Sequence, residues 1–313
     1  MGHDTILLIG ASGQIGAELT LLLRTNFGSA NVIATDIKKP GGDLFESGPF
    51  EELNVLDKTR LADLVNKYKP SQIYNMAAIL SATGEKYPQK AWQLNMEGLI
   101  NTLEIAIENK IKKVYWPSSI AAFGPTTPKE NTPQVTIMEP NTVYGISKLA
   151  GERWCDWYHL KYGLDIRSIR YPGIISYKTE PGGGTTDYAV DIYFKAKQTG
   201  KYACYLGENT MLPMMYMPDA IRATVELMEA PAEKIKVRSA YNLAAMSFTP
   251  GLVAASIKKT IPDFEISYNI DYRQKIAATW PGSIDDSTAR SDWGWKHEYD
   301  LDKMTKDMLD NIE

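Results

Sequence analysis

Short apolar runs alternate with segments of helical period along the first half of the chain. The apolar runs predict β-strands at residues 5–9, 31–36, 72–78, 113–116 and 165–170. Between them, apolar side chains recur with the spacing of an amphipathic helix, which predicts helices at residues 15–23, 61–68, 88–109 and 142–162. Strands that alternate with helices in this way are typical of α/β proteins, so we expect a Rossmann-type doubly wound parallel sheet.

The pattern becomes less regular after about residue 175. We expect a loop at residues 181–184, helices at 187–199 and 218–229, and strands at 240–243 and 264–268. These elements predict a smaller C-terminal lobe. We therefore expect a Rossmann domain at residues 1–175 and a second lobe at 176–313, part of which packs back on the first domain.

The composition is that of an ordinary globular protein of 313 residues, with 44% hydrophobic and 23% charged residues. A net charge of -4 gives no general attraction to nucleic acid or to an anionic membrane. No stretch approaches the ~18 consecutive apolar residues of a membrane span, and we expect no signal peptide. Cys155 and Cys204 make no disulfide framework, which favours a cytoplasmic protein. Neither the cysteines nor the histidines have metal-ligand spacing, so no metal site is expected.

Glycines follow the first predicted strand in the pattern Gly10-x-x-Gly13-x-x-Gly16. Glycine permits a tight turn, lets the backbone approach a pyrophosphate and allows close packing of helix on strand. The free N–H groups at the start of the following helix then favour an anion. The order of strand, glycines and helix therefore predicts a dinucleotide site in the first domain.

Asp36 ends the second predicted strand, 20 residues after Gly16. A carboxylate there can accept hydrogen bonds from both hydroxyls of the adenosine ribose and repels a 2′-phosphate, which predicts NAD rather than NADP. The alternative is that Asp36 only caps the strand end. We expect the cofactor-binding residues to be Gly10, Ser12, Gly13, Gln14, Ile15, Gly16, Asp36, Leu56, Asp57, Ala77, Ala78, Asn95, Tyr144, Lys148, Tyr171 and Ile174.

Tyr144 and Lys148 are four residues apart in a predicted helix and therefore lie on one face of it. A free tyrosine has a pKa of about 10 and is a poor base at neutral pH. A lysine cation roughly 6 Å away lowers that pKa by about two units at an effective dielectric constant of roughly 20. Ser119 follows the strand at 113–116 and can hydrogen-bond the reacting oxygen, although a serine there can equally cap the loop.

This combination resembles the extended short-chain dehydrogenase/reductase superfamily over about residues 5–175, with Ser119, Tyr144 and Lys148 in the catalytic positions. Residues 171–174 are similar to the segment that lies beside the nicotinamide in that superfamily. In the second half, residues 182–189, 212–222, 280–290 and 293–295 are similar to the short-chain type of L-threonine 3-dehydrogenase. The resemblance implies metal-independent threonine catabolism, in which NAD oxidises L-threonine at C3 to 2-amino-3-ketobutyrate with Tyr144 as the general base.

The resemblance also implies a substrate lobe and a homodimer, in which helices 88–109 and 142–162 pair across a two-fold axis. Asp187 can meet the substrate ammonium or cap the following helix, and Trp280 can form a wall of the pocket or belong to the core. We expect the substrate-binding residues to be Ser81, Gly84, Ser118, Ser119, Tyr144, Thr185, Thr186, Asp187 and Trp280.

Two other functions share part of this pattern. A sugar-nucleotide 4-epimerase or reductase has every motif of the first half. It needs a larger pocket with cations for a pyrophosphate, and no such cations are recognisable in residues 176–212. A non-catalytic NAD-binding sensor can dispense with the tyrosine and lysine, which are both present here.

Overall fold

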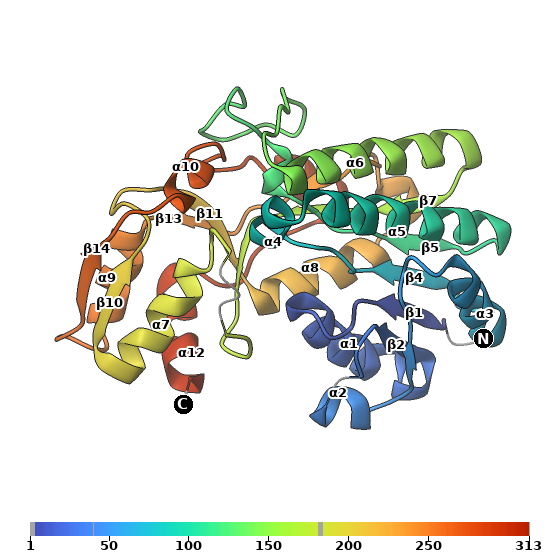
Figure 1. The fold of residues 1–313 in the computed structure, drawn as a ribbon, viewed down its shortest axis with the longest axis horizontal. Helices are drawn as coiled ribbons and strands as arrows, with labels where there is room; N and C mark the ends of the chain where they lie inside the picture. Colours follow the sequence, from blue (N-terminus) through green and yellow to red (C-terminus); the bar gives the residue numbers. More distant parts are fainter. Residues whose placement is uncertain (1–3, 40, 181–183, 313) are drawn as a thin grey trace.

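A parallel β-sheet of six strands forms the centre of the N-terminal half (Figure 1). The computed structural model describes residues 4–39, 41–180 and 184–312. The strand order is β3-β2-β1-β4-β5-β7, and all neighbouring strands are parallel. The predicted doubly wound α/β sheet is therefore confirmed. Its strands are β1 (Ile6–Ile9), β2 (Val32–Asp36), β3 (Phe50–Glu52), β4 (Gln72–Asn75), β5 (Lys113–Tyr115) and β7 (Asp165–Arg167).

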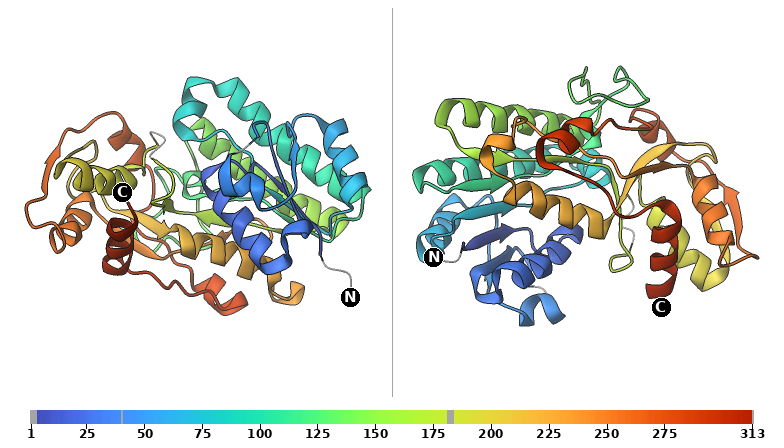
Figure 2. Two further views of the ribbon diagram at one scale, coloured as in Figure 1. Left: turned by 90° about the horizontal axis from the view of Figure 1, so that it is seen from below. Right: turned by 180° about the vertical axis from the view of Figure 1, so that it is seen from behind.

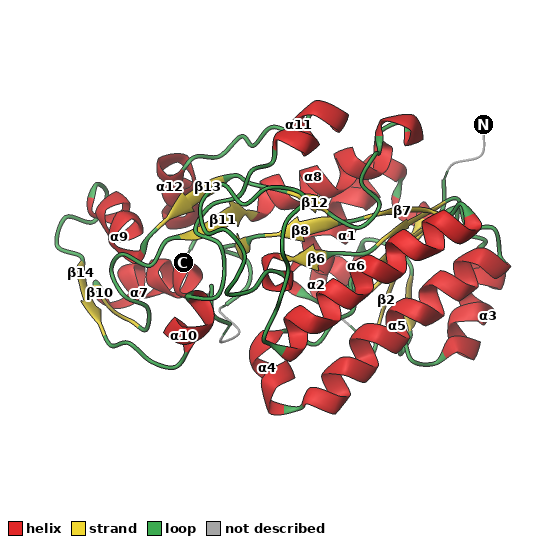
Figure 3. Cartoon of the chain, turned by 90° about the horizontal axis from the view of Figure 1, so that it is seen from above, coloured by secondary structure: helices red, strands yellow, loops and turns green. Residues whose placement is uncertain are grey.

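Alternating side chains along the strands build an apolar layer on each face of this sheet. Leu7 and Ile9 of β1 pack with helices α3, α5 and α6 on one face, where α5 and α6 lie side by side (Figure 3). Ile6 and Leu8 pack with α1 and α8 on the other face. No helix in the described ranges is both long and apolar enough to cross a membrane. The helices are α1 (Gln14–Phe27), α3 (Lys58–Tyr68), α5 (Pro88–Glu108), α6 (Val143–Tyr162) and α8 (Met217–Glu229).

The second lobe has an apolar core of its own and lies beside the main sheet (Figure 2). Two small sheets, of order β10-β14 and β13-β11-β9, are packed there with helices α7, α9 and α12. Its elements are β9 (Gly173–Ile175), α7 (Tyr188–Thr199), β10 (Lys201–Cys204), β11 (Leu212–Tyr216), β13 (Met246–Phe248), α9 (Pro250–Lys258), β14 (Glu265–Tyr268), α10 (Arg273–Ala277) and α12 (Leu301–Asn311).

The single strand expected at residues 165–170 is instead two strands. β7 ends at Arg167 in the main sheet, and β8 (Ile169–Tyr171) belongs to a small sheet of order β12-β8-β6. The Arg167 guanidinium donates to the carbonyl oxygens of Leu227 and Ala230 at the end of α8, each at 2.6 Å. This long-range contact holds the chain where it leaves the main sheet, and a local sequence pattern does not reveal it. The partners of β8 are β6 (Ser118–Ser119) and β12 (Tyr241–Asn242).

Other differences from the expected elements concern short segments. The strand expected at 72–78 ends at Asn75, so residues 76–80 are irregular, and an unexpected helix α4 (Ser81–Lys86) follows. Of the loop expected at 181–184, residues 181–183 lie outside the described part of the chain. Three further short elements are α2 (Gly42–Glu46), which follows β2, β3 at the sheet edge, and α11 (Ser287–Trp293).

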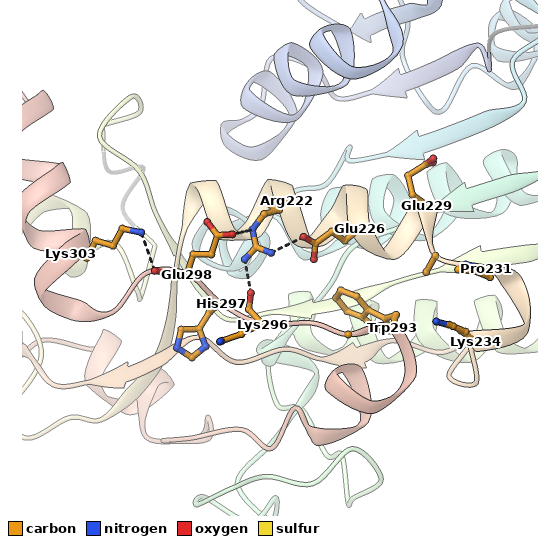
Figure 4. Close-up of a pocket in the computed structure, with 12 residues that line it drawn as sticks. Arg222, Glu226, Glu229, Pro231, Lys234, Trp293, Lys296, His297, Glu298 and Lys303 are labelled. Atoms are coloured by element: carbon orange, nitrogen blue, oxygen red, sulfur yellow. Dashed lines mark hydrogen bonds and ion pairs between the residues drawn. The ribbon is translucent and has the colours of Figure 1, made fainter.

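Arg222 of α8 fixes the C-terminal segment to a helix that packs on the main sheet (Figure 4). Its guanidinium donates to Glu226 and Asp219, each at 2.7 Å, and to the carbonyl oxygen of Lys296 at 2.6 Å. Asp219 also accepts a hydrogen bond from the backbone N–H of Glu298 at 3.0 Å. Because α8 covers the main sheet, part of the C-terminal half is anchored on the Rossmann sheet.

Candidate active site

A cavity of 560 Å³ opens at the carboxyl ends of β1 and β4, where the direction of the strand order reverses. Open α/β sheets bind their ligands at such a switch point. Residues from both halves of the chain line it. The predicted residues among them are Gly10, Gly13, Gln14, Ile15, Gly16, Ala78, Ser81, Ser118, Ser119, Tyr144, Lys148, Tyr171, Ile174, Thr185, Thr186, Asp187 and Trp280.

The glycine turn leaves room for a pyrophosphate against the start of α1. Gly10 has φ +86°, and a Cβ there would lie 2.8 Å from the backbone nitrogen of Ala77. A Cβ on Gly16 would lie 2.1 Å from the carbonyl oxygen of Gly10. The N-cap residue of α1 is Gly13, which has no side chain to accept hydrogen bonds from the first N–H groups of the helix. These N–H groups can therefore bind an anion in the cavity. This cradle fits the phosphates of a dinucleotide.

Asp36 lies at the end of β2, beside the glycine turn. One of its carboxylate oxygens accepts the N–H of Ser12 at 2.9 Å, and the other accepts the N–H of Ile37 at 2.7 Å. The carboxylate is thereby held at the strand end with lone pairs remaining for ribose hydroxyls. Asp57, expected near the adenine, caps α3 by accepting the N–H of Arg60 at 2.9 Å.

The first two turns of α6 bring Tyr144 and Lys148, the predicted catalytic pair, to the cavity. Thr142 caps this helix by accepting the N–H of Gly145 at 3.1 Å, which places Tyr144 in the first turn. The Nζ atom of Lys148 donates to the carbonyl oxygen of Pro117 at 2.5 Å and lies 5.5 Å from the centre of the Tyr144 ring. The lysine therefore contacts the ring side of the tyrosine and the end of the β5 segment.

The pKa values of this pair differ from the expected effect of Lys148. Burial raises the pKa of Tyr144 to about 12, and a side-chain hydrogen bond with Ser119 acts in the lowering direction. Burial lowers the pKa of Lys148 to about 7, against the raising effects of Cys155 and Glu152. The expected lowering of the tyrosine pKa by Lys148 is opposed by desolvation, which is the largest effect on Tyr144 and also lowers the pKa of Lys148.

Several expected substrate groups are engaged in hydrogen bonds within the protein. The Ser118 hydroxyl donates to the buried Glu152 at 2.6 Å, so this hydrogen bond is directed into the protein. The carboxylate of Asp187 accepts the N–H of Gly184 at 2.8 Å and closes the turn before α7, without capping that helix through its side chain. Trp280 both lines the cavity and belongs to the apolar core of the second lobe.

Other expected residues lie outside the cavity lining, and some lining residues were missed. Asn95 braces the loop after β4, because its amide exchanges hydrogen bonds with the backbone N–H and carbonyl of Ile79 at 2.8 and 3.1 Å. Leu80, Thr179 and Glu180 line the cavity without a motif that marks them. The expected residues that do not line it are Ser12, Asp36, Leu56, Asp57, Ala77, Gly84 and Asn95.

A wider hollow of 820 Å³ lies elsewhere, between α8 and residues 293–298 (Figure 4). Arg222, its central cation, is already bonded to Asp219, Glu226 and the Lys296 carbonyl oxygen. The remaining lining carries both signs of charge, so this hollow has no defined ligand chemistry. Among the described residues, no group of three or more histidine, cysteine, aspartate or glutamate side chains is placed to hold a metal ion.

The fold and the glycine cradle define a Rossmann-type dinucleotide-binding protein with a tyrosine–lysine pair at the cofactor site. The chain belongs to the NAD dependent epimerase/dehydratase family, whose model matches residues 6–244. This membership confirms the resemblance to the extended short-chain dehydrogenases/reductases, and it identifies an NAD-dependent oxidoreductase fold with NAD as the cofactor.

Close relatives cover nearly the whole chain. An uncharacterized epimerase/dehydratase of Staphylococcus saprophyticus is 54% identical over 310 residues, which are 98% of this chain and 97% of the relative. The holo form of a GalE-like L-threonine dehydrogenase from Cupriavidus necator is 57% identical, with a TM-score of 0.97 over 99% of this chain and 100% of that one. The L-threonine dehydrogenase from Clostridium difficile is 53% identical, with a TM-score of 0.97 over 100% of this chain and 98% of that one.

A more distant structure bears on the oligomeric state. It is a monomeric L-threonine 3-dehydrogenase from a metagenome, 48% identical, with a TM-score of 0.94 over 98% of both chains.

Replacing Gly16 by alanine should disrupt the cofactor cradle. The new Cβ would meet the carbonyl oxygen of Gly10 at 2.1 Å, and such overpacking costs about 1–3 kcal/mol. We expect Gly16→Ala to lower the unfolding temperature and to abolish most of its increase on adding NAD. Gly41→Ala is the matched control, because a Cβ at Gly41 meets nothing within 4 Å. A Gly16→Ala protein with the stability and NAD response of the wild type would contradict the described cradle.

Proposed function

We propose that this protein oxidises L-threonine at C3 to 2-amino-3-ketobutyrate with NAD. The observation that carries the proposal is the similarity to L-threonine dehydrogenases over both halves of the chain. The sequence identity to one of them is 57%. The tyrosine, lysine and serine of the expected chemistry also border one cavity. We assign NAD binding to residues 1–175 and the substrate lobe mainly to 176–313, and we infer that the enzyme is cytoplasmic and independent of metal.

The cavity chemistry favours an amino acid over a sugar nucleotide. Lys148 is the one lysine or arginine among the described residues that line it, and this lysine is bonded to the carbonyl oxygen of Pro117. A sugar nucleotide would bring a second pyrophosphate beyond the glycine cradle, where Glu180 and Asp187 add negative charge and no lysine or arginine among the described lining residues other than Lys148 could offset it. Hydroxyl groups are the more frequent donors there. We assign substrate contacts to Ser81, Ser119, Tyr144, Thr185, Thr186, Asp187 and Trp280, with Gly84 behind Tyr144, whereas the hydroxyl of Ser118 is bonded to Glu152.

The chemistry follows from groups at the start of α6. Tyr144, in its ionised form, accepts the proton of the C3 hydroxyl, and Ser119 hydrogen-bonds the same oxygen. Oxidised NAD supplies the hydride acceptor when it is bound. Lys148 lies against the tyrosine ring and stabilises its anion when protonated. Residues at the glycine turn and Asp36 hold the nucleotide at the edge of the sheet.

L-threonine with NAD should yield NADH and 2-amino-3-ketobutyrate, which decarboxylates to aminoacetone. The measurement is NADH absorbance together with mass analysis of the product. UDP-glucose, the control substrate, should give neither NADH nor UDP-galactose. Conversion of the nucleotide sugar without any oxidation of threonine would replace this proposal by the epimerase alternative.

The pH dependence of the reaction should report the ionisation of Tyr144, which is partly buried. Because the pKa of Tyr144 is raised to about 12, its basic form is a minority at neutral pH. We expect kcat/KM for L-threonine to rise with pH over the alkaline range, by up to about tenfold for each pH unit.

Tyr144→Phe should lower kcat at least about a hundredfold and leave NAD affinity nearly unchanged. Tyr272→Phe is the control, because Tyr272 is an exposed tyrosine that does not line the cavity. Normal turnover in Tyr144→Phe would exclude it as the base.

We also propose a homodimer, formed by an aromatic patch on α6. The patch consists of the exposed side chains of Trp154, Trp157, Leu160 and Tyr162, of which Leu160 is 77% exposed, and the buried Tyr158 packs against the aromatic ones. Trp157 and Tyr158 stack edge to face at 5.2 Å, and Tyr162 extends the cluster. A contiguous apolar surface of this kind suits a two-fold interface. Because one similar enzyme is monomeric, the patch, rather than family membership, carries this assignment.

Light scattering at micromolar concentration should give the mass of two chains. Leu160→Glu should shift the protein to one chain, because it places a charge in the apolar interface. Leu252→Glu is the control, since Leu252 is also exposed but lies on α9, away from α6. A wild-type protein with the mass of one chain would refute the dimer.

A further inference from the structure

A fully buried ion pair lies one helical turn beyond Lys148. Glu152 of α6 and Arg170 of β8 are 0% and 2% exposed. The Nε and Nη2 atoms of Arg170 donate to the two carboxylate oxygens of Glu152, each at 2.8 Å. Removing two charges from water is costly, and a buried pair is tolerated where the remaining hydrogen-bonding capacity is filled. One of the groups that fill it here, the Ser118 hydroxyl, belongs to a residue that lines the cavity.

On one side, the pair fixes the segment that carries Ser119. The Ser118 hydroxyl donates to Glu152 at 2.6 Å, and Ser118 is the register partner of Arg170 between β6 and β8. Lys148 holds the preceding Pro117 carbonyl oxygen at 2.5 Å. Pro117 and Ser118, the two residues before Ser119, are therefore both bonded to α6. The side chains that bond them, Lys148 and Glu152, are one helical turn apart.

Tyr144, Lys148 and Glu152 form one line along α6, which we term the α6 polar stripe. Their spacing of four residues places them on the same helix face. Lys148 and Glu152 hold the β6 segment, and Tyr144 lies where Ser119 emerges from it. The distance between the reacting groups is thus set by contacts behind the cavity.

On the other side, the pair reaches a wall of the cavity. Arg170 donates to the side-chain oxygen of Asn242 at 2.9 Å, and the Asn242 amide donates to the carbonyl oxygens of Thr132 and Asp285 at 3.0 and 3.2 Å. The loop that contains Thr132 also holds Trp280, because Lys129 of this loop donates to the Trp280 carbonyl oxygen at 3.3 Å. The loop that contains Asp285 follows Trp280 directly in the chain.

We propose that Glu152 and Arg170 are positioning residues of the reaction: their ion pair aligns Ser119 with Tyr144 and, through Asn242, holds the loop of Trp280 against the pocket. This inference rests on the proposed oxidation of the substrate hydroxyl. It requires no contact between the pair and the substrate, which the burial of both side chains prevents.

The first test is Ser118→Ala, which removes the bond to Glu152 and leaves every charge in place, including Lys148, Glu152, Arg170 and the nearby Glu85. We expect kcat to fall about tenfold, the scale of one lost hydrogen bond to a charged group, while the Kd for NAD stays within about twofold. Because Ser119 lowers the pKa of Tyr144, its misalignment should shift the acidic limb of the kcat/KM profile to higher pH.

A double-mutant cycle separates positioning from direct contact. Glu152→Gln keeps the side-chain shape, and the Ser118→Ala/Glu152→Gln double variant should lose no more activity than the stronger single variant. If the losses of activity in the two single variants instead multiply in the double variant, Ser118 acts on the substrate independently of Glu152, which would overturn the proposal. If Glu152→Gln does not fold, the proposal is judged from the kcat and the pH profile of Ser118→Ala alone. Wild-type values of both would overturn the proposal.

Asp165→Asn is the control for breaking a largely buried carboxylate–arginine pair, in which the Arg167 side chain is 0% and the Asp165 side chain 17% exposed. Asp165 bonds Arg167 at 2.7 Å at the start of β7, at the edge of the sheet away from the cavity. It should lower stability without changing kcat. Ultraviolet titration of the NAD complex, with Tyr144→Phe as reference, measures the ionisation of Tyr144 without substrate. An unshifted tyrosine pKa in Ser118→Ala refutes the alignment, whether or not threonine is the substrate.

Discussion

The close approach of α6 to the strand ends is the constraint on which the candidate site depends. A Cβ on Gly145 would lie 2.1 Å from the carbonyl oxygen of Ala121, and one on Gly151 would lie 2.3 Å from the Trp116 ring. Because both positions lack a side chain, the helix backbone can pack directly against the segment after β5. This contact lets the α6 polar stripe reach the β6 segment and the cavity together.

The same contact determines the electrostatics of the site. Packing α6 this closely buries Lys148 and part of Tyr144, and the desolvation raises the pKa of the tyrosine and lowers that of the lysine. At neutral pH Tyr144 is therefore uncharged, whereas Lys148, with a pKa of about 7, is close to half protonated. The charge of oxidised NAD acts in the opposite direction on the tyrosine, so the site is suited to become basic when the oxidised cofactor is present.

Local sequence patterns predict much of the fold and the reacting groups. The glycine turn, the alternating strands and helices and the Tyr144–Lys148 spacing each depend on residues close together in the chain, and the cavity contains them. The sequence does not reveal that Ser118 faces Glu152, that the strand at 165–170 divides, or that desolvation raises the pKa of Tyr144. Each of these features depends on packing between distant segments.

The central claim is that the tyrosine of α6 removes a proton while hydride leaves C3 of threonine. Its most direct test uses L-threonine carrying deuterium at C3 and measures the mass of the reduced cofactor. The account predicts that the deuterium appears in the NADH and that kcat/KM falls relative to unlabelled threonine. Reduced cofactor without deuterium, or no reduced cofactor from threonine at all, would contradict it.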